Sequence, residues 1–279
     1  MGYRTILTVL TGADRAAQTL GSAIALARAH DAHLDVLCIG VDTTQVGYYY
    51  ESAAVFIQQT AIDRAREEAD AALKLVRDTL SREDIRWAAE GVVAQLGGLG
   101  SLVGLRARFA DLVVLPRPYG EGSAQPAEGV LEAALFEGQV PVLVLPDAPL
   151  TLPLGRRIVL AWNQSDEALS AARKALPFLI AAERVIVTVI DPPRHGPERS
   201  DPGGALSQWL VRHGVRAEVA VLAKTMGRVS EVISRQAVDA DADLIVMGAY
   251  GHSRLREAIL GGATRNMLER GNIPVLMAH

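Results

Sequence analysis

Short apolar runs alternate with longer amphipathic segments along most of the chain. The runs at residues 34–39, 112–115 and 244–247 are too short for typical helices and read as buried strands. Between such runs apolar residues recur at helical spacing, as at 17–27. The glycine-rich run at 97–101 predicts a turn, with Ser101 capping the next helix. Strands that alternate with helices predict parallel β-α-β units with helices on both faces of each sheet.

The second half of the chain repeats the first. Three pairs of segments align: 3–10 with 156–162, 110–115 with 242–247, and 138–145 with 271–278. We therefore expect an α/β protein of two tandem doubly wound domains, each with a mainly parallel five-stranded sheet. The domains are predicted at residues 1–145 and 156–279. Residues 146–155, which carry three prolines, are predicted to be a linker.

Composition narrows the class of protein. The formal net charge is -4 and the pI is about 5.9, which argues against a general binder of nucleic acids or membrane surfaces. No apolar run approaches the roughly 20 residues that span a bilayer, and the N-terminus lacks a signal-peptide core. The one cysteine, Cys38, lies in an apolar run and is predicted to be a buried, inert thiol. We expect a cytoplasmic protein.

The most informative stretch follows the apolar run at 244–247. Glycines stand at 248, 251, 261 and 262, and the segment Ala263–Arg270 has helical composition and ends before Gly271. In a strand–loop–helix arrangement of this kind, main-chain NH groups and a helix N-terminus face an anion. Neither a Walker loop nor a dinucleotide G-x-G-x-x-G motif is present. The alternative is a glycine-rich turn without a ligand.

This spacing, G-x2-G-x9-G, resembles the nucleotide loop of the universal stress protein family, whose members have an adenine-nucleotide α-hydrolase-like fold. The resemblance implies binding of ATP, or of ADP or AMP, in the second domain; it leaves the need for Mg²⁺ open. One departure is Gly262, which stands where the family's pattern usually has Ser or Thr. The loop residues that the resemblance assigns to the nucleotide are Gly248, Gly251, His252, Arg254, Gly261, Gly262, Ala263 and Thr264.

Two further residues join this predicted site by the same resemblance. The family places a carboxylate at the end of its first strand, and Asn163 stands at the matching position of the second half. An amide both donates and accepts, so it remains suited to base or ribose recognition. Alternatively Asn163 begins a turn and Ser165 caps the next helix. Val189 matches an apolar position that the family uses against the adenine, and by itself it is an ordinary core valine.

The first half departs from the nucleotide pattern at each matching position. Thr11 replaces the carboxylate, Pro116 replaces Gly248, and Glu128–Gly129 replaces Gly261–Gly262. Proline has no NH to offer, and a glutamate repels phosphate. We therefore expect no nucleotide in the first domain.

The sequence contains no recognisable catalytic set and no metal cluster. Asp191 and Asp243 are candidate metal ligands by element position alone, and each also suits a strand-end or turn role. The sequence thus favours a nucleotide-binding stress-response or regulatory protein with slow hydrolysis at most. The alternatives are a hydrolysing or adenylating enzyme of the same fold and a ligand-free scaffold that acts through protein partners.

The predicted last strand of each half begins after a proline, Pro141 or Pro274, which suits an edge strand. In the family, equivalent edge strands pair between subunits. Two copies in one chain can satisfy this pairing internally as a pseudo-dimer, and a homodimer is the further option.

Overall fold

The computed structural model describes residues 2–12, 16–42, 51–119, 126–192, 200–249 and 262–279. The chain divides into two compact units, Gly2–Val140 and Pro141–His279. The division falls before the last strand of the first sequence repeat, because that strand pairs with the last strand of the second repeat. Within the described residues no helix is both long enough and apolar enough to cross a bilayer.

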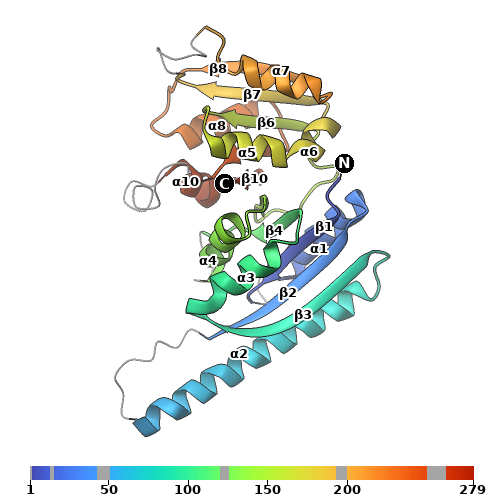
Figure 1. The fold of residues 1–279 in the computed structure, drawn as a ribbon, viewed down its shortest axis with the longest axis vertical. Helices are drawn as coiled ribbons and strands as arrows, with labels where there is room; N and C mark the ends of the chain where they lie inside the picture. The colour runs from blue at the N-terminus through green and yellow to red at the C-terminus, as the bar shows by residue number, and fades with distance from the viewer. Residues whose placement is uncertain (1, 13–15, 43–50, 120–125, 193–199, 250–261) are drawn as a thin grey trace. The chain divides into compact units, whose positions relative to one another are not determined.

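The unit Gly2–Val140 contains one parallel layer of strands in the order β3-β2-β1-β4. Its strands are β1 (Thr5–Leu10), β2 (His33–Asp42), β3 (Arg86–Gln95) and β4 (Leu112–Pro116). Its helices are α1 (Ala16–His30), α2 (Glu51–Leu80), α3 (Leu99–Ala107) and α4 (Pro126–Glu132), with a 3-10 turn at Leu96–Gly98 and a π-helical turn at Ala133–Glu137. Figure 1 shows α1 and α2 on one face of the strands and α3 and α4 on the other.

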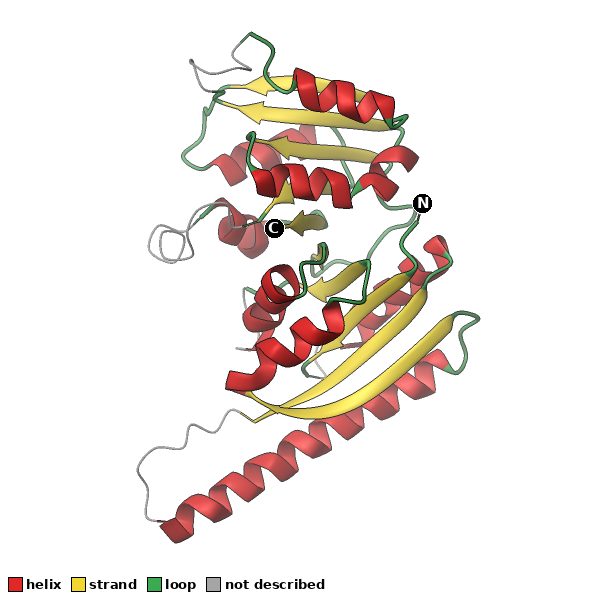
Figure 2. Ribbon diagram, in the orientation of Figure 1, coloured by secondary structure: helices red, strands yellow, loops and turns green. Residues whose placement is uncertain are grey.

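The unit Pro141–His279 has the strand order β5-β10-β9-β6-β7-β8. Its strands are β5 (Val142–Leu145), β6 (Arg157–Trp162), β7 (Arg184–Ile190), β8 (Ala217–Leu222), β9 (Leu244–Gly248) and β10 (Val275–Ala278). Its helices are α5 (Asp166–Lys174), α6 (Leu176–Ala181), α7 (Gly204–Arg212), α8 (Val229–Asp239) and α10 (Ala263–Arg270). The β5–β10 pair is antiparallel, and the pairs β10–β9, β9–β6, β6–β7 and β7–β8 are parallel. Figure 2 shows these strands as one layer between two layers of helices.

The predicted α/β class with mainly parallel strands and helices on both faces is therefore confirmed. The repeat extends to single hydrogen bonds at the start of β1 and at the start of β6. The Asp111 carboxylate accepts the main-chain NH groups of Arg4 and Thr5 at 2.7 and 3.0 Å. The Asp243 carboxylate accepts those of Arg156 and Arg157, both at 3.0 Å. In each unit an aspartate thus ties the central strand to a neighbouring strand.

One local prediction in the first unit is wrong. Ser101 lies inside α3, which begins at Leu99, and it does not cap a later helix. Two glycines of α3 serve close packing: a Cβ at Gly104 would lie 2.5 Å from Cβ of Glu137, and a Cβ at Gly100 would lie 2.9 Å from its Oε1. The lack of a side chain lets α3 approach the π-helical turn, so the glycines continue the helix instead of breaking it.

Candidate functional site

The candidate site lies at the carboxyl ends of the strands in the unit Pro141–His279. The strand β6 lies between β7 and β9, and all three are parallel. The chain adds β7 and β8 on one side of β6 and then returns to add β9 and β10 on the other side, so the order of strand addition reverses between β6 and β9. In doubly wound folds, ligands bind at such a switch point. Asn163 directly follows β6 and Gly248 ends β9. The fold therefore brings two predicted site residues, 85 positions apart in the sequence, to the ends of neighbouring strands.

Asn163 is exposed and takes part in the turn that leads into α5. Its Oδ1 accepts the main-chain NH of Ser165 at 3.2 Å. Ser165 caps α5, since its Oγ accepts the NH of Ala168 at 3.2 Å. The turn-and-cap alternative is thus present in the structure. The Asn163 NH₂ group is not used in that turn bond, so a ligand contact by the amide remains compatible with it.

Gly248 has a packing reason to be glycine. A Cβ at this position would lie 2.7 Å from the main-chain nitrogen of Ala168 and 2.9 Å from the Cβ of Glu167. Both residues belong to the first turn of α5, so the end of β9 passes directly against the start of that helix. From the sequence, Gly248 was expected to belong to a phosphate-binding loop. The structure adds a helix–strand contact that excludes a side chain whether or not a ligand is bound.

The start of α10 carries the other described loop residues. Gly262 is the N-cap and makes no side-chain capping bond, and Ala263 and Thr264 begin the helix. Thr264 is 3% exposed, so its side chain is packed inside the fold. The first turn is fixed by Asn266, whose main-chain NH and Nδ2 each lie 3.1 Å from the Gly262 carbonyl oxygen.

Sequence reasoning missed Arg228, which precedes α8. Its Nη1 donates to Oδ1 of Asn266 at 2.9 Å and so joins the start of α8 to the first turn of α10. No motif marks either residue, and 38 positions separate them. Only the packing of α8 beside α10 reveals the pair.

The remaining predicted residues divide into two groups. Val189 is 3% exposed and stands beside Trp162 in the β6–β7 register, so it is a core residue next to the switch point. Gly251, His252, Arg254 and Gly261 lie outside the described residues. The assignment of those four residues to a nucleotide remains a prediction from the sequence.

Trp162, the last residue of β6, has a buried indole. The residue is 8% exposed, and its Nε1 has no hydrogen-bond partner within the described part of the chain. A buried NH without an acceptor costs about 1–3 kcal/mol. This orphaned donor stands directly before Asn163.

The aspartates considered as metal ligands hold the main chain instead. Asp243 accepts two NH groups at the start of β6, and Oδ1 of Asp191 accepts the NH of Lys224 at 3.1 Å. Among the residues that the structure describes, no group of three or more His, Cys, Asp or Glu is arranged to hold a metal ion. Cys38 is fully buried, and burial raises the pKa of its thiol to about 11, so the thiol stays protonated near neutral pH.

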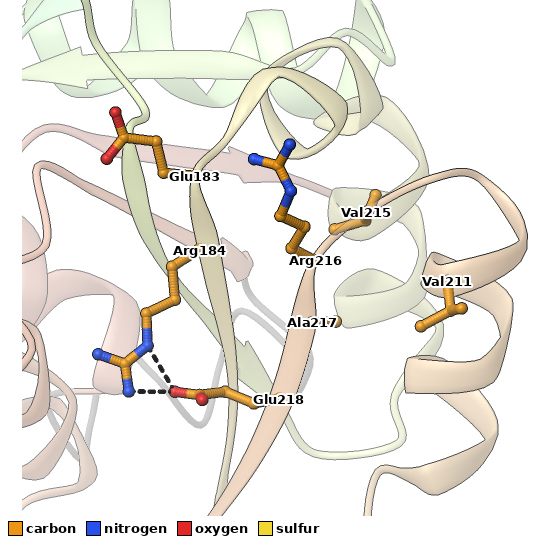
Figure 3. Close-up of a pocket in the computed structure, with 7 residues that line it drawn as sticks. All are labelled: Glu183, Arg184, Val211, Val215, Arg216, Ala217 and Glu218. Atoms are coloured by element: carbon orange, nitrogen blue, oxygen red, sulfur yellow. Dashed lines mark hydrogen bonds and ion pairs between the residues drawn. The ribbon is translucent and has the colours of Figure 1, made fainter.

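A cleft of about 440 Å³ lies at the opposite edge, where β7 and β8 begin. In Figure 3 the side chains of Arg184 and Glu218 point toward each other from these two strands, and they form an ion pair at 2.5 Å. A third lining residue, Glu183, pairs with Arg156 at 2.8 Å. Because both carboxylates are already neutralised and the cleft is far along the strands from the switch point, it contributes nothing to the candidate site.

Comparisons with known proteins agree on one family. Residues 155–279 match the family model described as the universal stress protein family. A universal stress protein of Synechocystis sp. is 31% identical over 145 residues, which cover 49% of this chain and 46% of that protein. A universal stress protein of Methanocaldococcus jannaschii is 40% identical over 47 residues, 17% of this chain and 29% of that protein. The chain thus spans less than half the length of these curated relatives.

Solved structures extend the similarity of fold to nearly the whole chain. The crystal structure of a universal stress protein from Archaeoglobus fulgidus superposes with a TM-score of 0.73 at 17% identity, covering 98% of this chain and 95% of that one. A putative universal stress protein from Pseudomonas aeruginosa superposes with a TM-score of 0.58 at 16% identity, covering 99% and 93%. At such low identity the agreement concerns the fold.

Proposed function

We propose that this chain, whose residues 155–279 match the universal stress protein family model, is a tandem universal stress protein that binds ATP, or ADP or AMP, in its second unit. One observation carries the proposal. Asn163 directly follows β6 and Gly248 ends the neighbouring β9, at the switch point of the sheet, where doubly wound folds bind ligands. The loop that follows Gly248 has the spacing of the family's nucleotide loop.

In the proposed complex, main-chain NH groups of the loop and the start of α10 bind the phosphates, and Asn163 and Val189 face the nucleoside. Gly262 supplies an NH where the family's pattern usually has a hydroxyl side chain. That difference removes one hydrogen bond and leaves the main-chain contacts in place. Binding is therefore expected to be weaker than with a Ser or Thr at 262.

The proposed role is regulatory rather than catalytic. Efficient phosphoryl transfer needs positioned metal ligands and a group that orients the nucleophile. Asp191 and Asp243 hold main-chain NH groups, so they are poor candidates for that work. We propose a cytoplasmic protein whose nucleotide state is read by a partner protein, with slow hydrolysis at most. A phosphate-release assay with Mg²⁺ tests this role: rapid turnover would favour the enzyme alternative.

Isothermal titration with ATP, ADP and AMP tests binding itself. Saturable binding by the wild type supports the proposal, and heat changes no larger than those of dilution would favour the scaffold alternative. The variant Gly251→Val places a branched side chain in the loop and should lower affinity about tenfold or more, through lost phosphate contacts. Gly12→Val is the matched control, because Gly12 follows β1 in the first unit and an added Cβ there meets no atom of the described residues within 4 Å. Equal affinities for the two variants would show that the ligand lies elsewhere.

A further inference from the structure

Arg228 stands where two helices of the second unit begin. Its backbone is extended and forms the N-cap of α8, and its guanidinium reaches the first turn of α10 through the bond to Asn266. The start of α8 and the start of α10 therefore share one arginine side chain. Each start carries the positive end of a helix dipole.

Asn266 holds the guanidinium without neutralising it. The residue is 9% exposed, and its Nδ2 donates to the Gly262 carbonyl oxygen. That bond fixes which way the amide points and leaves Oδ1 to accept from Arg228. The acceptor is a neutral oxygen, so the arginine is positioned and keeps its full positive charge.

Other arginines nearby are paired with carboxylates on their own helix. Arg265 pairs with Glu269 at 2.8 Å, and Arg235 pairs with Asp239 at 3.4 Å. Within the described residues no carboxylate forms an ion pair with Arg228. The nearest acidic side chain in sequence, Glu231, accepts the main-chain NH of Arg228 at 3.2 Å instead of binding its guanidinium.

This arrangement is electrostatically unfavourable until an anion arrives. A cation beside a helix N-terminus is repelled by the positive end of the helix dipole, and here the guanidinium lies beside two such ends. An anion at the start of α10 reverses the sign of this interaction, because it is attracted by the helix and by the arginine together. Arginine also suits phosphate geometrically, since its planar group donates two parallel hydrogen bonds.

We propose that Arg228, positioned by Asn266, binds the phosphate chain of the nucleotide and makes the site prefer ATP over adenosine. This inference rests on the proposed function and names the residue that reads the phosphates. It differs from the loop contacts in that Arg228 belongs to the connection between β8 and α8, outside the glycine motif.

The test compares ligands that differ in phosphate content. Titrations with ATP, adenosine and inorganic tripolyphosphate are run on the wild type, Arg228→Gln and Arg228→Lys at low ionic strength. For Arg228→Gln, the Kd for ATP and for tripolyphosphate should rise about tenfold, the loss typical of one charged hydrogen bond, while the Kd for adenosine changes less than twofold. Arg228→Lys keeps the charge but loses the bidentate hydrogen bonding of the guanidinium, so its Kd for ATP should lie between those of the wild type and Arg228→Gln.

Arg235→Gln is the matched control, since it removes an arginine from α8 whose charge is already paired; its ATP affinity should equal that of the wild type. Urea unfolding midpoints verify that each variant is folded.

Equal losses for ATP and adenosine in Arg228→Gln would show a structural role and overturn the inference, as would an unchanged ATP affinity. If the wild type binds neither ATP nor adenosine, the proposed function fails; tripolyphosphate binding that weakens in Arg228→Gln would still support Arg228 as an anion-binding residue, and no such binding would overturn both.

Discussion

The carboxyl edges of the two units have related topology and opposite chemistry. In the second unit β9 ends in Gly248, and α10 begins at Ala263 after the N-cap Gly262, which has no side chain to cap it. In the first unit the corresponding strand β4 ends in Pro116, and the first turn of α4 carries Glu128. The carboxylate of Glu128 accepts a hydrogen bond from the Tyr119 hydroxyl at 2.8 Å, in a partly buried position.

The difference shows two ways in which the same fold meets the positive end of a helix dipole: with a carboxylate of its own chain, or by leaving the helix start to a bound anion. A carboxylate in the first turn stabilises a helix by about 0.3–1 kcal/mol, because it complements the dipole. The first unit supplies that negative charge from its own chain. The second unit supplies an extra positive charge, Arg228, at the corresponding edge. The expectation that the first unit binds no nucleotide stays a prediction, and Glu128 gives it a structural reason.

The largest expected effect comes from Gly248→Ala. The added methyl group would meet main-chain atoms of Glu167 and Ala168 at 2.7–2.8 Å, so β9 or α5 must shift. Overpacking of this kind typically costs about 1–3 kcal/mol. Chemical unfolding measures the loss, and Gly12→Ala in the first unit, which meets nothing within 4 Å, should cost far less. Similar stabilities for the two variants would mean that the close contact is absent in solution.

Ser165→Ala should destabilise the protein by about 1 kcal/mol, because it removes the cap of α5. Asn163→Ala removes the adjoining turn bond and should cost somewhat less. Nucleotide titration then separates the two roles of Asn163. Loss of affinity in Asn163→Ala but not in Ser165→Ala would support ligand recognition, whereas unchanged affinity in both would restrict Asn163 to the turn.

Tyr119→Phe tests the carboxyl edge of the first unit, where Glu128 supplies the negative charge at the start of α4. It removes the donor to Glu128 and should lower stability by about 0.5–1.5 kcal/mol, with no change in nucleotide affinity. The double variant with Glu128→Gln reveals whether the two side chains act as a pair, since their separate effects then fail to add. A fall in ATP affinity with Tyr119→Phe would indicate that the nucleotide binds in the first unit, which contradicts the proposal.

The smallest stability change is expected for Trp162→Phe. The smaller ring loses buried area, but the substitution also removes an NH that has no acceptor within the described residues. These two contributions oppose each other, so the net change should stay within about 1 kcal/mol. Differential scanning calorimetry measures it. A loss of 3 kcal/mol or more would show that the indole NH is bonded in solution.

Much of the fold follows from local patterns in the sequence. Short apolar runs, such as the one that forms β9, indicate buried strands because they are too short for helices and are bounded by residues that end the strand. Pro177 lies in the first turn of α6, shortly after α5 ends at Lys174, where its missing NH costs no helical hydrogen bond. Local signals were misleading at Ser101, which lies inside α3, where Gly100 and Gly104 let the helix approach Glu137.

The repeated α/β units and the glycine spacing after β9 can be seen in the amino-acid sequence, because periodicity and backbone freedom are properties of neighbouring residues. Which distant groups meet depends on how the helices and strands pack. This packing joins Arg228 to Asn266, pairs Tyr119 with Glu128, and places Gly248 against the first turn of α5. Each contact arises where separate elements pack together, and the charge balance at the two edges follows from that packing. No local pattern encodes it.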